Sequence, residues 1–105
     1  MSITIDPLDE SMLIELPGGD MILRGITELA NGDTGEYGLL VLVASMRLSK
    51  LGLKLPQRDD IERPVNLQLY KLLQGTYGIG AHSRYNALLR SLSSFIHTLE
   101  RAVSQ

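Results

Sequence analysis

The sequence predicts a mainly α-helical protein, a small helical bundle of three to four helices with a short N-terminal β element. Residues 39–44, LLVLVA, form the longest strongly apolar run. A helix that is apolar on every side must be surrounded by its neighbours. Residues 82–103 repeat apolar side chains at alternating steps of four and three, which is the periodicity of a helix.

The length of 105 residues allows a single modest core. We therefore expect one domain, residues 1–105. Within it, residues 1–20 should form short strands and turns, and residues 21–105 should form the helical core.

The apolar run lies inside residues 38–51, which we expect to be a buried central helix beginning near residue 36. Asp33 and Glu36 are spaced as a capping box before it. Gly52 followed by an apolar residue is typical of a Schellman ending. A buried strand would show the same run, but this stretch is long for a strand, so we favour the helix.

Short β-like runs open the chain. Residues 2–5 and 12–16 are the two candidate strands, separated by turn-forming residues. After the sequence PGG, the spacing of apolar residues predicts a short helix, from a cap at Asp20 to a stop at Gly32. The alternative is a hairpin in which residues 21–26 pair with residues 12–16.

Two more helices are expected after a polar loop. Pro64 suits the start of a helix, and residues 64–74 then carry an apolar face. A glycine-rich connection leads to the amphipathic helix 82–103. Packing of its apolar stripe on the central helix 38–51 is the simplest arrangement.

Composition narrows the class of protein. There is no cysteine, which excludes disulfides, thiolate metal sites and a cysteine nucleophile. The N-terminal residues lack a basic region, and no stretch approaches the length of a membrane span, so we expect a cytoplasmic protein without membrane contact. Residues 1–36 carry eight acids and one base, and residues 37–105 carry nine bases and four acids. We expect these halves to attract each other; the alternative is a basic face for an anionic partner.

The best candidate for a small-ligand site is the glycine-rich turn and the helix start after it, residues 75–84. Free backbone donors there could hold a phosphate or a carboxylate. The candidate binding residues are Gly78, Gly80, His82, Ser83 and Arg84. Their spacing matches neither the dinucleotide fingerprint nor a phosphate-binding loop, so we favour a plain turn between helices.

No metal site, cofactor or catalytic residue is assigned. His82 and His97 are the only histidines, and no third ligand accompanies them at metal spacing. A Ser-His-acid arrangement cannot be assembled around either one.

Residues 65–92 can also be interpreted as a helix-turn-helix-like DNA reader. Its candidate contacts, together with a base further along the last helix, are Arg84, Asn86, Arg90 and Arg101. The formal net charge of −2 gives the chain no general attraction to phosphate, so nucleic acid is the less favoured partner.

We expect a non-enzymatic protein-interaction or assembly module that self-associates, as a homodimer, through its apolar helices. These helices offer more apolar surface than a chain this small can easily cover. Nucleic-acid binding by residues 65–92 is the alternative, and anion or small-ligand binding at residues 75–84 is the second alternative. The sequence carries no signature of a particular protein partner.

Overall fold

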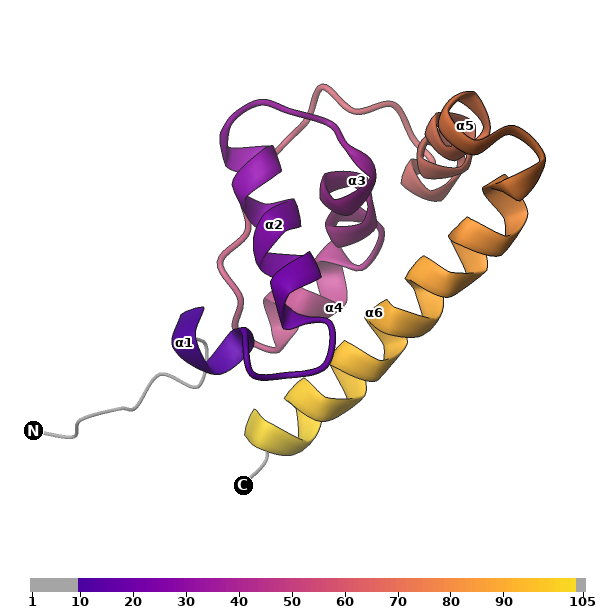
Figure 1. Cartoon of the computed structure of the whole chain (residues 1–105). Helices are drawn as coiled ribbons and strands as arrows, with labels where there is room; N and C mark the ends of the chain where they lie inside the picture. Colours follow the sequence, from indigo (N-terminus) through magenta and orange to yellow (C-terminus); the bar gives the residue numbers. More distant parts are fainter. Residues whose placement is uncertain (1–9, 104–105) are drawn as a thin grey trace, which may run out of the picture.

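The computed structural model describes residues 10–103, and within them the regular elements are all helices (Figure 1). In order they are α1 (Glu10–Leu13), α2 (Gly19–Ala30), α3 (Glu36–Val43), α4 (Ser45–Lys50), α5 (Val65–Tyr77), the 3₁₀ turn η1 (Gly78–Gly80) and α6 (Ala81–Val103). In Figure 1, α2, α3 and α4 gather on one side, α5 lies on the other, and α6 runs as a long diagonal past both groups. The predicted mainly helical fold is confirmed.

The N-terminal β element is not seen in the described range. Met12 and Leu13 lie in α1, and the N–H groups of Glu15 and Leu16 donate back to their carbonyls at 3.2 and 3.1 Å. These local bonds satisfy backbone groups that a strand would have to pair with another strand. The alternative hairpin is wrong as well, because residues 21–26 lie inside α2. The candidate strand at residues 2–5 lies outside the described residues.

Both helix endings that glycine predicts are confirmed. Gly32 adopts φ 83° after α2, and the N–H of Asp33 donates to the carbonyl of Glu28 at 2.8 Å, as in a Schellman motif. Gly52, with φ 105°, ends α4 in the same way. The predicted cap at Asp20 is wrong, because α2 already starts at the preceding glycine and has no side-chain cap bond.

The predicted central helix is broken into α3 and α4. Ala44, with φ −107° and ψ 19°, leaves the helical conformation between them. Before the break nearly every residue is apolar, whereas α4 carries Arg47 and Lys50 and follows the surface. The capping box is also wrong. The backbone of Asp33 closes α2, and α3 starts after Gly35 without a side-chain hydrogen bond to its cap.

The last two helices begin within one residue of their predicted starts, and Pro64 is the extended cap of α5 instead of its first helical residue. Pro64 precedes α5, which continues through Gly75, the predicted stop, to Tyr77. The bounds of α6 match the predicted 82–103 to within one residue at its start.

The core is aliphatic around one aromatic ring. Its largest fully buried side chains are Phe95, Ile22, Leu29, Leu40, Leu48, Leu69, Leu73, Leu99 and Val41. α3 packs mainly against α2 and α5, and α6 packs mainly against α5 and meets α3 only over a short stretch. The predicted packing of the α6 stripe on the central helix is therefore found only over a short stretch of α3, and a groove remains between α4 and α6.

Candidate functional site

An open groove of about 930 Å³ lies among the central helices, α5 and α6. Around it, α6 packs mainly against α5 and meets α3 only over a short stretch. The end of α3, α4, the start of α5 and the middle of α6 form it. Its lining residues are Leu42, Val43, Ala44, Ser45, Met46, Arg47, Arg63, Pro64, Val65, Asn66, Tyr85, Leu89 and Ile96.

Half of the long apolar run is only partly covered and borders this groove. Leu40 and Val41 are fully buried, but Leu42, Val43 and Ala44 are only half-buried and line the groove. The expectation that the whole run is surrounded is therefore met on one side only. A contiguous uncovered apolar surface is the usual mark of a binding site on a small domain.

Met46 belongs to this uncovered surface. It is 75% exposed, although it is apolar. It lines the groove and also two adjoining hollows, one of about 430 Å³ beside residues 55–59 and one of about 380 Å³ beside Leu51 and Glu100. The unbranched methionine side chain adapts its shape to whatever packs on it, so it suits a contact surface.

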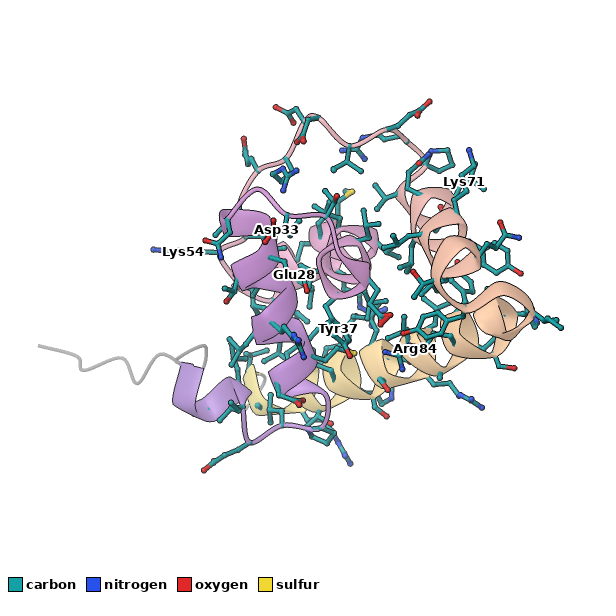
Figure 2. The ribbon with its side chains drawn as sticks, turned by 45° about the horizontal axis from the view of Figure 1, so that its top comes forward. Glu28, Asp33, Tyr37, Lys54, Lys71 and Arg84 are labelled. Atoms are coloured by element: carbon teal, nitrogen blue, oxygen red, sulfur yellow. The ribbon has the colours of Figure 1, made fainter. Side chains whose placement is uncertain are left out.

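A polar cluster, made of Glu36, Tyr37, Tyr77 and Arg84, joins α3 to α5 and α6. Arg84 Nη2 donates to Glu36 Oε2 at 2.6 Å and to the Tyr37 hydroxyl at 3.2 Å. The Tyr77 hydroxyl donates to Glu36 Oε1 at 2.9 Å. Figure 2 shows Tyr37 and Arg84 pointing toward each other across the space between α3 and α6. The hydrogen bond with Glu36 raises the pKa of Arg84 and also that of Tyr77.

The polar cluster acts as a clamp between helices. The side chains of Glu36 and Arg84 are 16% and 33% exposed, so solvent screens their attraction less than that of a surface pair. The Arg84 guanidinium also lies 5.6 Å from the centroid of the Tyr77 ring. Because the carboxylate, the guanidinium and both phenols bond to one another, the cluster suits positioning of α3 and α6 more than reaction with a ligand.

The candidate ligand residues of the glycine-rich turn sit at the corner between α5 and α6. Gly78, Gly80, His82 and Ser83 are exposed there. The N–H of Ala81 donates to the carbonyl of Gly78, which uses one of the donors expected to be free. Arg84, the fifth candidate, turns inward to Glu36 instead of outward to the turn.

The candidate nucleic-acid residues are spread along α6. Arg84 belongs to the polar cluster, and the Asn86 amide lies 3.2 Å from His82 Nε2. Arg90 is exposed beside a hollow of about 260 Å³. Arg101 is exposed in the last turn of α6. At 1.5 Å per residue, Arg84 and Arg101 lie about 25 Å apart along the helix. The structure does not bring the four residues together into one patch.

Sequence reasoning missed the groove and the acidic half of the polar cluster. The apolar run identified Leu42 and Val43 as apolar helix residues. It could not show that their side chains are only partly covered by the neighbouring helices. For Glu36 the signal was the charge difference between the two halves of the chain, and its ion pair with Arg84 links those halves.

Comparison with known protein families, curated proteins and solved structures finds no match for this chain. Among residues 10–103, no three His, Asp or Glu side chains gather where they could hold a metal ion. Each helix in this range is too short or too polar to cross a membrane.

Proposed function

We propose that this chain is a non-enzymatic protein-interaction module that assembles into a homodimer through the groove between α3–α4 and α5–α6. The observation that carries the proposal is the half-open apolar run. Leu42 and Val43 stay half-buried while the two residues before them are fully buried. Covering such apolar surface is favourable by roughly 25 cal/mol per Å².

The composition of the groove supports a protein partner. Apolar side chains from three segments line its centre, and Arg47, Arg63 and Asn66 lie at its margins. An apolar centre with a polar rim is the usual anatomy of a protein–protein interface. A second copy is the simplest partner, because most soluble oligomers are assemblies of identical chains.

Sedimentation equilibrium of Met46→Glu tests the proposal. Burying a methionine side chain is worth about 1.5–3 kcal/mol, and each 1.4 kcal/mol is tenfold in affinity. We expect wild type to approach twice the monomer mass at high concentration, and Met46→Glu to raise the dimer Kd by about tenfold or more. Because Met46 is 75% exposed, the variant monomer should fold normally by circular dichroism.

The matched control is Ile79→Glu. Ile79 is 99% exposed at the corner between α5 and α6 and does not line the groove. Its replacement adds the same charge and removes a similar apolar side chain, so the Kd should stay within about twofold of wild type, well under the 1.4 kcal/mol that a tenfold change represents. Equal weakening by both variants, or a wild type that stays monomeric at every concentration, would reject the groove as a dimer surface.

A further inference from the structure

The margin of the groove is basic as well as polar. Arg47 and Arg63 line the groove, and Lys50 lies on the adjoining hollow that shares Met46. Arg47 pairs with Glu100 at 2.6 Å, whereas Arg63 and Lys50 form no ion pair within residues 10–103. Even with Asp59 on the other adjoining hollow, the bases outnumber the acids around this surface.

This charge selects what can fill the groove. Two copies that met face to face through their grooves would bring the basic margin of one copy, with Arg63 and Lys50, toward the basic margin of the other. Like charges brought together at an interface oppose association. The occupant should therefore be apolar, so that it covers Leu42 and Met46, and acidic, so that it complements the margin.

One segment of the chain has this composition. Residues 1–9, MSITIDPLD, lie outside the described residues and carry two acids and no base. If the segment binds in an extended conformation, Ile3 and Ile5 would share one side of it, because side chains alternate along an extended chain. Asp6 and Asp9 follow them. An extended stretch of this length spans at most about 30 Å, which is enough to follow a groove between helices.

We propose that residues 1–9 of one copy bind in the groove of a second copy, and that the second copy returns the same contact. This inference rests on the proposed function and names the segment that makes the contact. In Figure 1, α1, where the described chain begins, lies on the far side of α2 from α5, whereas the groove opens between α4 and α5. When two copies exchange their N-terminal segments, both grooves are filled and the dimer has closed two-fold symmetry.

Paired substitutions in the full chain test the inference. Ile3→Asp with Ile5→Asp removes the apolar side of the segment, and Ser2→Asp with Thr4→Asp adds the same charge on the opposite side. We expect the isoleucine pair to raise the dimer Kd at least tenfold, and the control pair to change it by less than threefold. If the isoleucine pair leaves the Kd unchanged while Met46→Glu still raises it, the inference fails and the proposed function stands. If wild type never dimerises, both fail.

Cross-linking shows which copy supplies the segment. Because the chain has no cysteine, single cysteines can be placed without interference. Ser45 lines the groove and is half-buried. We expect an oxidised mixture of the Ile5→Cys and Ser45→Cys variants to give a disulfide-linked dimer that joins the two different chains. If the double variant Ile5→Cys, Ser45→Cys instead forms an internal disulfide in a monomer, exchange between copies is overturned.

Discussion

Arg84 and Glu36 join the first turn of α6 to the first turn of α3, with Arg84 Nη2 2.6 Å from Glu36 Oε2. A cation at the start of a helix meets the positive end of the helix dipole, which disfavours it. Glu36 offsets this, because its carboxylate faces the guanidinium and suits the start of its own helix. The pair therefore ties the start of α6 to the start of α3.

Glu36→Ala should destabilise the protein by about 1–3 kcal/mol, because it leaves the partly buried Arg84 without its carboxylate. Urea unfolding measures the loss. The control is Glu100→Ala, which breaks the ion pair between Glu100 and Arg47. Their side chains are more exposed, 36% for Glu100 and 58% for Arg47. That loss should stay below about 1 kcal/mol. Equal, small losses in both variants would show that the polar cluster is not a clamp.

Gly25→Ala should destabilise the protein although alanine is the better helix former. A Cβ at Gly25 would clash with the carbonyl oxygen of Tyr37 and lie 2.6 Å from Cγ2 of Val41, so α2 and α3 would have to separate. Forced repacking of this kind costs about 1–3 kcal/mol. Thermal unfolding should show a lower midpoint.

Gly75→Ala is the matched comparison for this close approach. Gly75 lies inside α5, and nothing is within 4 Å of the position of its Cβ. The same substitution should therefore stabilise the protein by about 0.4–1 kcal/mol. A destabilised Gly75→Ala together with an unchanged Gly25→Ala would contradict the packing of α2 on α3.

Arg58 ties the loop before α5 to the end of α2, and this tie should weaken in acid. Its Nη1 donates to the Asp33 carbonyl at 3.0 Å, and its Nε and Nη2 donate to the two carboxylate oxygens of Asp60 at 2.8 and 2.7 Å. The hydrogen bond from Arg58 lowers the pKa of Asp60 to about 2.

The stabilisation from Asp60 is complete above the unfolded-state pKa of about 3.9 and is lost as the pH falls toward about 2. Urea midpoints of wild type and Asp60→Asn should therefore differ at pH 6 and converge between pH 4 and pH 2. A difference that stays constant through this range would mean that the carboxylate charge contributes nothing.

Local sequence signals predicted most of the helices. The stops at Gly32 and Gly52 and the bounds of α6 follow from glycine and from periodicity. The prediction of a strand at residues 12–16 was wrong. An apolar run this short is too brief for its periodicity to distinguish a helical turn from a strand. The break at Ala44 was also missed, since alanine favours helix and no glycine or proline marks the break.

The groove could not be predicted because it depends on how helices cross. The sequence shows that Leu42 and Leu40 are both apolar, but it does not show that Leu42 is half-buried at the groove while Leu40 is fully buried. The partner of Arg84 was similarly hidden. The opposite net charges of the two halves of the chain predicted that the halves attract each other. They did not show which carboxylate of the acidic half pairs with Arg84.

The rate at which Met46 is oxidised to its sulfoxide, measured across protein concentration by peptide mass spectrometry, tests the central claim most directly. In the monomer Met46 is 75% exposed, so dilute protein should oxidise there quickly. If the groove is where two copies meet, the rate at Met46 should fall at least severalfold once the dimer forms, while the rate at half-buried Met21 stays the same. A dimer in which Met46 oxidises as fast as in the monomer would contradict the claim.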